Sequence, residues 1–197
     1  MDFKRHIEIA WNLTLANVVS LILMTLVMVA VSFLTLGILA PVTMAGYTQS
    51  LLELIRTGRE PRVQDLFSHM RLFLPLLGFG IAVFVASSIG FAMLFVPGIV
   101  VVAAVAFCCI YMLPLMTDKE LGIVDAVKES YAMAMRGERV DHVVVTIIFL
   151  AITTLGGTVF IGVLFTQPLA TLFLLSTYEE KVQKTSPPAT TGKAESL

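Results

Sequence analysis

The ionisable side chains that could do chemistry within the apolar part of this sequence are few and widely separated. Glu53 falls near the end of an uncharged segment, and Arg56 follows it by about one helical turn. His6, His69 and His142 are too scattered along the chain to suggest a metal site. Catalysis or ion transport within a membrane usually needs several buried ionisable groups. We therefore predict that Glu53 is a structural group in an ion pair at the membrane surface, not a proton or ion site.

Other motifs of enzymes and cofactor-binding proteins are also missing from the sequence. It contains no phosphate-binding loop, nucleophile motif or dinucleotide fingerprint. Its two cysteines, Cys108 and Cys109, are adjacent within an apolar segment, where a strained disulfide between neighbours is not expected. We predict a non-catalytic protein with no catalytic residue, no cofactor site and no metal site.

The composition places the chain among membrane proteins. Of its 197 residues 57% are hydrophobic and 14% are charged, and the mean hydropathy is +0.92. Soluble domains carry about 25% charged residues. The net charge of −1 gives no indication of a nucleic-acid partner, and we expect none.

The uncharged residues form three long segments, each long enough for about two membrane spans of about 20 residues. The segments are residues 9–52, 72–117 and 142–178. Each contains an interior proline, which ends one helix and is tolerated in the first turn of the next. The predicted hairpin turns are at Pro41, at Pro97 and Gly98, and at Pro168. This gives an all-α polytopic fold of about six spans, arranged as three antiparallel hairpins: 13–36, 39–55, 72–95, 98–116, 143–165 and 168–180.

The basic residues test this topology independently. All 13 Lys and Arg residues fall in four segments, at residues 4–5, 56–71, 119–139 and 181–193. If each uncharged segment is a hairpin, all four face one side, which the positive-inside rule assigns to the cytoplasm. Three single spans would place basic loops on both sides. We therefore predict a multi-pass protein with both termini in the cytoplasm.

The charged segments also contain apolar residues at helical spacing. Residues 62–71 and 122–136 are predicted as short amphipathic helices, the second lying on the bundle or membrane surface through Val124, Val127 and Tyr131. From Gln183 the sequence is rich in Pro, Ser and Thr and has no apolar period. We predict one helical membrane domain over residues 1–182 and a flexible cytoplasmic tail over residues 183–197.

Small and polar residues within the predicted spans indicate helix packing. Gly78, Ala82, Ala86 and Gly90 recur every four residues, which predicts a strip for close helix contact. Six polar residues in or near the spans are expected to hydrogen-bond between helices, with lining of a pathway as the alternative. They are Asn12, Asn17, Gln49, Ser87, Ser88 and Gln167.

A family resemblance rests on residues 96–137. The stretch Val96-Pro97-Gly98-Ile99, then Asp118, Gly122, Asp125-Ala126, Ser130 and Arg136-Gly137, resembles the membrane domain associated with glycerophosphoryl diester phosphodiesterases, and stand-alone bacterial relatives of it. The resemblance implies a helical fold of about six spans in a bacterial cytoplasmic (inner) membrane. It implies no enzyme activity here, because the spans and short loops leave no room for a phosphodiesterase domain.

Two functions remain open at this point. The first is a scaffold or accessory subunit whose spans pack with membrane lipid, with a protein partner or with further copies of the chain. The alternative is a transporter or channel for a small or lipid-like solute, with helices broken at prolines around its site.

Overall fold

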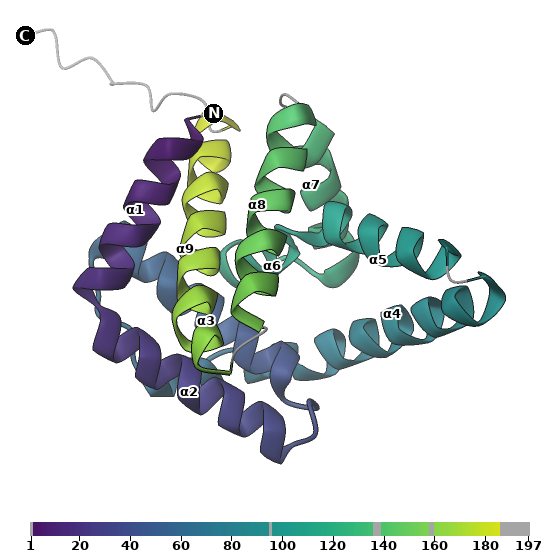
Figure 1. The fold of residues 1–197 in the computed structure, drawn as a ribbon, viewed down its shortest axis with the longest axis horizontal. Helices are drawn as coiled ribbons and strands as arrows, with labels where there is room; N and C mark the ends of the chain where they lie inside the picture. Colours follow the sequence, from purple (N-terminus) through teal and green to yellow (C-terminus); the bar gives the residue numbers. More distant parts are fainter. Residues whose placement is uncertain (1, 95, 136–138, 158–159, 186–197) are drawn as a thin grey trace, which may run out of the picture.

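A computed structural model describes residues 2–94, 96–135, 139–157 and 160–185 of the chain. Within these ranges the chain is helical with turns and has no strand, which confirms the predicted all-α class (Figure 1). The elements, in chain order, are α1 (Phe3–Ala16), α2 (Val18–Leu34), α3 (Ala40–Thr57), the 3-10 helices η1 (Val63–Phe67) and η2 (Met70–Leu72), α4 (Phe73–Leu94), α5 (Val96–Cys109), α6 (Met112–Asp118), α7 (Ile123–Met135), α8 (Arg139–Gly157) and α9 (Phe160–Thr185).

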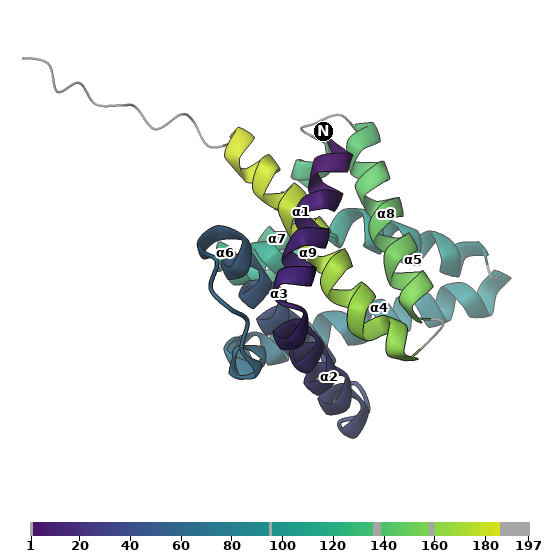
Figure 2. The same ribbon diagram turned by 60° about the vertical axis from the view of Figure 1, so that its left-hand side comes forward.

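Helices α3 and α9 form the centre of the molecule. Helix α9 contacts α1, α2, α3 and α8, and α1 crosses it in Figure 2. Tyr47 and Leu51 of α3, and Phe173 and Tyr178 of α9, are fully buried, as is Tyr111 at the start of α6. Residues 39–55 and 168–180, which were predicted as two of six equivalent spans, therefore form the internal core of a bundle.

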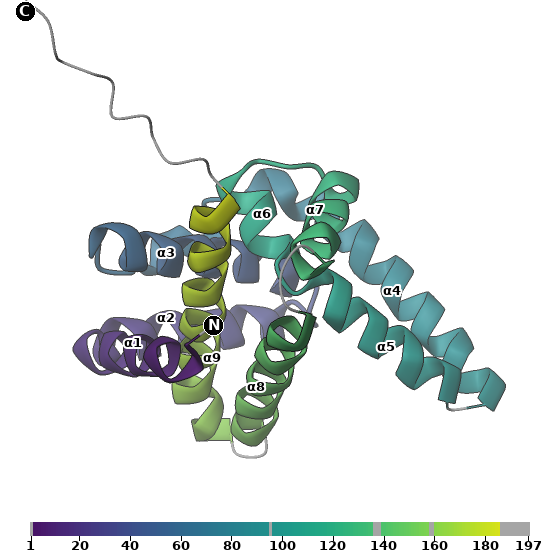
Figure 3. The ribbon, with the colours of Figure 1, turned by 90° about the horizontal axis from the view of Figure 1, so that it is seen from above.

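Helices α4 and α5 have the opposite character. They pack against each other and project from the rest of the molecule, in a direction clearly different from that of the α8–α9 pair (Figures 1 and 3). The helical stretches Val63–Met93 and Val96–Asp118 are long and apolar enough to cross a membrane, and only 6% and 28% of their most apolar windows are buried. If two sharply bent helix pairs, α1–α2 and α7–α8, each count as one span, the number rises to four. The structure thus supports two to four candidate spans, compared with the six predicted.

The predicted turn at Pro168 is wrong. Pro168 lies inside α9, and the chain passes from α8 to α9 between Gly157 and Phe160. A proline inside a helix removes one backbone hydrogen bond, but a helix held on several sides by its neighbours tolerates this loss. Near the connection, Gly156 meets Thr166 so closely that a Cβ atom would overlap its side chain. Gly156 therefore allows the close approach of α8 and α9 near the turn, and Pro168 does not form the turn.

The other two prolines lie where the first turn of a helix was predicted. Pro41 follows the α2–α3 connection, in which Leu36 and Gly37 have positive φ angles of 50° and 82°. Pro97 and Gly98 lie in the first turn of α5. Gly98 is a packing residue as well, because a Cβ atom there would overlap the ring of Phe91 on α4.

The predicted strip of small residues is an internal contact only at one end. A Cβ atom on Gly90 would lie 2.8 Å from the backbone nitrogen of Gly98, so α4 and α5 touch there. Nothing lies within 4 Å of such an atom on Gly78, and Ala82 and Ala86 are exposed. Within this chain the strip therefore makes a close contact at Gly90, and contact of its remaining residues with another helix stays a prediction.

The two charged segments predicted as amphipathic α-helices differ in outcome, because only the second forms one. Residues 62–71 form 3-10 helices and not an α-helix, with the Asp65 carboxylate accepting a hydrogen bond from the Arg62 amide at 3.1 Å. Helix α7 buries Ala126, Ser130, Met133 and Ala134. Of the predicted face, Val127 packs against the core, while Val124 and Tyr131 are exposed within this chain, so their contact with a membrane surface stays a prediction.

The predicted boundary between the membrane domain and the tail lies slightly too early in the sequence. Helix α9 continues to Thr185, past the predicted start of the tail at Gln183. Residues 186–197 of the tail, residue 95 at the end of a predicted span, and Arg136 and Gly137 of the family resemblance lie outside the described residues.

Candidate functional site

The predicted span 98–116 is interrupted at Ile110 and Tyr111, between α5 and α6. In a continuous helix the Tyr111 amide would donate to the Phe107 carbonyl. Here the Phe107 carbonyl accepts from Nε2 of His142 at 2.8 Å, and the Tyr111 amide donates to Oγ of Ser130 at 3.3 Å. Pro114, within the next turn, has no amide hydrogen and weakens the helical ladder further. Side chains from α7 and α8 therefore take over the two backbone groups that the break frees.

His142 is itself held in one orientation. Because its Nε2 donates to a carbonyl, the neutral ring presents Nδ1 as an acceptor, and the Lys181 ammonium lies 3.3 Å from that atom. Lys181 also donates to the Met133 carbonyl at 3.3 Å and lies 5.1 Å from the centre of the Tyr111 ring. The break is thus fixed from α7, α8 and α9 together.

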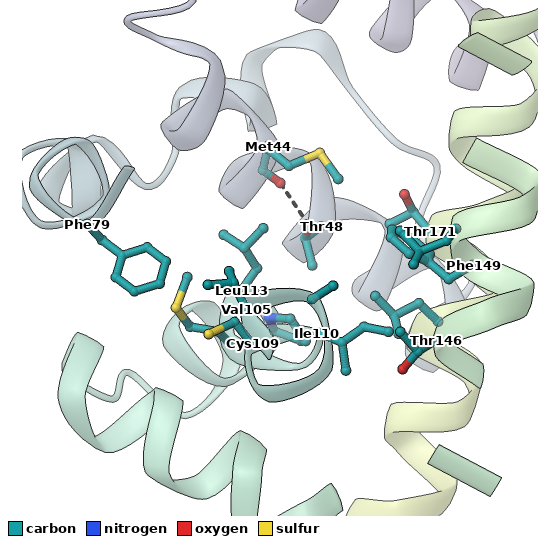
Figure 4. A pocket seen from close by; sticks show the side chains of 15 residues that line it. Met44, Thr48, Phe79, Val105, Cys109, Ile110, Leu113, Thr146, Phe149 and Thr171 are labelled. Carbon is teal, nitrogen blue, oxygen red and sulfur yellow. Dashed lines mark hydrogen bonds between the residues drawn. The ribbon is translucent and has the colours of Figure 1, made fainter. Parts of the chain in front are cut away.

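A cavity of about 280 Å³ lies beside this break, among helices α3, α4, α5, α6, α8 and α9. In Figure 4, Phe79 of α4 lies across the cavity from Thr146, Phe149 and Thr171. The lining contains no acidic, basic or histidine side chain. It consists of Met44, Thr48, Phe79, Val105, Ala106, Cys109, Ile110, Met112, Leu113, Pro114, Thr146, Phe149, Leu150, Thr171 and Leu174.

The three threonines of the lining differ in their hydrogen bonding. The Thr48 hydroxyl donates to the Met44 carbonyl at 2.8 Å, as Figure 4 shows, and the Thr146 hydroxyl donates to the His142 carbonyl at 2.9 Å. Each is bonded to its own helix. Thr171 is 1% exposed, and its hydroxyl has no hydrogen-bond partner among the described residues. The Thr171 hydroxyl is therefore a buried polar group without a partner in the described part of the chain, and it has almost no surface accessible from the cavity.

A layer of ion pairs joins the helix ends that carry the basic segments. Arg56 of α3 pairs with Asp118 of α6 and with Glu179 of α9, and the Tyr178 hydroxyl donates to Asp118 at 3.0 Å. The hydrogen bond to Asp118, with that to Glu179, raises the pKa of Arg56 against the opposing effect of burial. This guanidinium is therefore a permanent charge between two carboxylates.

Further contacts join helix ends near the same basic segments. His6 of α1 bonds to Glu180 at 2.6 Å and to Ser176 at 2.7 Å, both on α9. Arg71 pairs with Glu120 at 2.6 Å, which joins the start of α4 to the end of α6. Segments far apart in the sequence thus meet through polar and charged side chains.

Glu53 is in an ion pair, as predicted. It pairs with Arg59 and not with Arg56, and Arg59 also bonds to Asp65 at 2.8 Å. Arg56 points instead to the α6 and α9 carboxylates. Glu53 therefore belongs to a local cluster that anchors η1 to α3.

The polar residues expected to join helices mostly do not. Asn17 donates to a carbonyl of its own helix, and Ser88 is exposed. Among the described residues, Gln167 alone of the six hydrogen-bonds to another helix, from its Nε2 to the sulfur of Met44 at 3.6 Å. Contacts between helices come from other side chains, including Thr25 with Tyr47 and Tyr111 with Thr177.

Sequence reasoning missed His142, Ser130 and Thr171, the residues that define the break and the cavity. Their partners lie far away in the chain, so no local spacing identifies them. The one local signal is Pro114, which lies within one turn of the break. Cys108 and Cys109 are half-buried free thiols, and the described residues contain no group of three His, Cys, Asp or Glu that could hold a metal ion.

Comparisons with protein-family models, with curated proteins and with solved structures gave no match for this chain.

Proposed function

We propose that this chain is a non-catalytic integral membrane protein that serves as a scaffold or accessory subunit. It packs through its apolar helices with membrane lipid, with a protein partner or with further copies of itself. One observation carries the proposal, which is that the projecting α4–α5 pair is apolar along its length and largely uncovered by the rest of the chain.

The exposure of this pair is too extensive for a surface in water. Ile81, Phe84, Ile89 and Met93 of α4 are all more than half exposed, with Phe84 and Met93 at 72% each. Contiguous apolar patches beyond a few hundred Å² mark protein or membrane contacts. A bilayer or an apolar partner around α4 and α5 would remove this surface from water.

The layer of ion pairs supports a location with all four basic segments on one side. Arg56, Arg71 and His6 join these segments to α6 and α9. The positive-inside rule favours the cytoplasm for such a layer. We propose six spans in a bacterial cytoplasmic membrane, with both termini cytoplasmic. Membership of the family of phosphodiesterase-associated membrane domains is part of this proposal and rests on the resemblance at residues 96–137.

Site-specific photocrosslinking tests the scaffold function. A benzophenone side chain at Ala82, which is exposed on α4, should give crosslinks to lipid or to a protein of defined mass in intact membranes. The matched control is Gln64, which is exposed on η1 among the charged segments. Crosslinks at Gln64 but none at Ala82, together with labelling of Ala82→Cys by a water-soluble reagent, would contradict the proposal.

The cavity beside the α5–α6 break favours a second candidate, a transporter or channel for a small or lipid-like solute. Broken helices commonly line transport sites. Here, however, His142 and Ser130 already bind the freed Phe107 carbonyl and Tyr111 amide. Those two groups are therefore not available to an ion, and an uncharged solute suits the site better.

A further inference from the structure

A second pocket, of about 500 Å³, lies among α1, α3 and α9, where the start of α1 meets the end of α9 (Figure 1). The two helices run antiparallel, because His6 bonds to Glu180 near one end and the Trp11 ring packs against Phe165 at the other. The pocket shares no lining residue with the cavity beside the α5–α6 break. Its volume falls within the range of about 300–1,000 Å³ that is usual for ligand sites.

Two opposite charges line this pocket without forming an ion pair with each other. Arg5 is exposed, and its guanidinium has no partner among the described residues. Glu179 binds Arg56 through Oε1, which leaves Oε2 without a hydrogen-bond partner within the described ranges. This Oε2 is not one of the fully buried unpartnered atoms, so a ligand in the pocket can reach it. The pocket therefore offers a free donor group and a free acceptor of opposite charge.

The other polar side chains of the lining are of two kinds. Glu180 is fully engaged, because one of its oxygens bonds to His6 and the other to Lys184. Asn12 and Gln183 are exposed, and their carboxamides make no side-chain hydrogen bond in the described part of the chain. Because a carboxamide both donates and accepts, these two can bond to a ligand group of either sign.

The pocket also has an apolar wall. Ile9, Leu13 and Ile55 line it, and Leu13 and Ile55 pack against the hydrophobic core. Leu13 lies eight residues beyond Arg5, which is about 12 Å along α1 at a rise of about 1.5 Å per residue. A charged region at the helix ends with an apolar wall further along α1 matches a molecule that has a polar headgroup and a hydrocarbon part. If the helix ends lie at the cytoplasmic surface, as the proposed function states, a phospholipid of that leaflet reaches both.

The two free charges favour a headgroup that carries both signs. Arginine binds phosphate through parallel N–H donors. A primary ammonium has three donors and can bond to Oε2 of Glu179. A quaternary ammonium has no N–H donor and is usually held by aromatic rings, and no Phe, Tyr or Trp is among the described lining residues. A headgroup with a net negative charge would be repelled by the carboxylates of Glu179 and Glu180.

We propose that this pocket binds the phosphoethanolamine headgroup of a membrane phospholipid, with the phosphate on Arg5 and the ammonium on Glu179. The apolar wall of Ile9 and Leu13 contacts the hydrocarbon part. The proposal rests on the proposed membrane location and goes beyond it by naming the class of lipid and its site.

Native mass spectrometry of the full chain in detergent tests the choice of lipid. Dioleoyl phosphatidylethanolamine, phosphatidylcholine and phosphatidylglycerol are added at equal concentrations. Among chains with one bound lipid, we expect the ethanolamine lipid about ten-fold more often than the choline lipid, because the latter cannot hydrogen-bond to the charged Glu179. The glycerol lipid should also bind less than the ethanolamine lipid. Free phosphoethanolamine at the same concentration should not displace the lipid, since it cannot cover the apolar wall.

Matched variants make the result specific. Arg5→Gln should lower binding of the ethanolamine and choline lipids alike, because both carry the phosphate. Lys4→Gln is its control, since Lys4 is a neighbouring exposed cation that does not line the pocket. Glu179→Gln should remove the preference for the ethanolamine lipid over the choline lipid. Ile9→Trp should fill the pocket and exclude both lipids, whereas Leu15→Trp, exposed elsewhere on α1, should not.

Three outcomes would overturn the inference. They are equal binding of the three lipids to the unmodified protein, equal losses in Arg5→Gln and Lys4→Gln, and displacement of the lipid by free phosphoethanolamine. None of these depends on Glu179→Gln, which also removes a partner of Arg56. Extraction of membranes with alkaline carbonate separates this result from failure of the proposed function. A chain that stays in the membrane but binds the three lipids equally contradicts only the lipid site, while a chain released into solution contradicts the membrane location itself.

Discussion

Arg56 joins three helices although about one third of its own side chain is exposed. Its guanidinium binds Asp118 and Glu179, whose side chains are only 13% and 15% exposed. Without this arginine two largely buried carboxylates would face each other with no cation between them. Hydrogen bonds to charged groups contribute about 1.5–3 kcal/mol each.

We expect Arg56→Met to lower the free energy of unfolding by about 2–3 kcal/mol, because it leaves these carboxylates unpaired. Denaturant titration of the protein in detergent would measure the change. Arg71→Met is the matched control, since Arg71 and Glu120 are both more than half exposed and such pairs contribute about 0–1 kcal/mol. Equal losses in the two variants would show that Arg56 does not hold the charged layer together.

His142 supplies the hydrogen-bond donor for the Phe107 carbonyl at the break between α5 and α6. His142→Leu leaves the Phe107 carbonyl without its donor and Lys181 without its ring nitrogen. An unsatisfied buried acceptor costs about 1–3 kcal/mol, so we expect a loss of stability of that size. His69→Leu is the control, because the hydrogen bond of His69 is to its neighbour Ser68. Retained stability in His142→Leu would indicate that α5 and α6 rejoin without help from α8.

The candidate site could be predicted from sequence only in its general character. The absence of buried charges indicated an uncharged environment, and the lining of the cavity agrees with it. The individual residues could not be found, because the lining residue Thr171 lies on α9 while the break lies between α5 and α6. Glu53 was assigned to the correct kind of interaction, but which arginine it meets depends on where η1 packs.

At the scale of elements, proline gave correct helix starts at Pro41 and Pro97 and an incorrect turn at Pro168. Tertiary packing explains why Pro168 does not end a helix. Helix α9 is enclosed by its neighbours, so one missing hydrogen bond does not end it. Conversely, the break at Ile110 and Tyr111 depends on donors and acceptors supplied by α7 and α8. A prediction from the local sequence alone cannot include the packing around α9 or the hydrogen-bond partners that α7 and α8 supply.

The small residues of α4 make a prediction about this element. Gly90→Leu should separate α4 from α5 and destabilise the protein, because Gly98 lies directly against position 90. Gly78→Leu should leave the fold intact, since there is open space around Gly78. If Gly78, Ala82 and Ala86 contact a partner, Gly78→Leu should still weaken that association. Thermal unfolding and the apparent mass in mild detergent would separate the two effects, and loss of folding in Gly78→Leu would contradict the assignment.

At the scale of the whole molecule, the direction of the helix pairs decides how the chain lies in a membrane. The α4–α5 pair and the α8–α9 pair run in clearly different directions (Figures 1 and 3). Six parallel spans would therefore require the pairs to align in the bilayer. The ion pairs of His6 and Arg56 join α1, α3, α6 and α9 and include neither α4 and α5 nor α8, so they do not themselves fix the direction of the two pairs.

Cysteine labelling of whole cells tests the topology in a chain with Cys108 and Cys109 replaced by serine. In the proposed six-span arrangement, Leu36→Cys and Ile99→Cys react with a membrane-impermeant maleimide, because the α2–α3 connection and the start of α5 both lie outside. Leu36 is 91% exposed and Ile99 about half exposed, so both are accessible. Glu120→Cys, between α6 and α7, should react only after permeabilisation. Labelling of Ile99→Cys without Leu36→Cys would leave α4 and α5 as the spanning hairpin and place α2 and α3 on the cytoplasmic side. Protection of Ile99→Cys in intact cells would contradict a spanning α4–α5 pair as well.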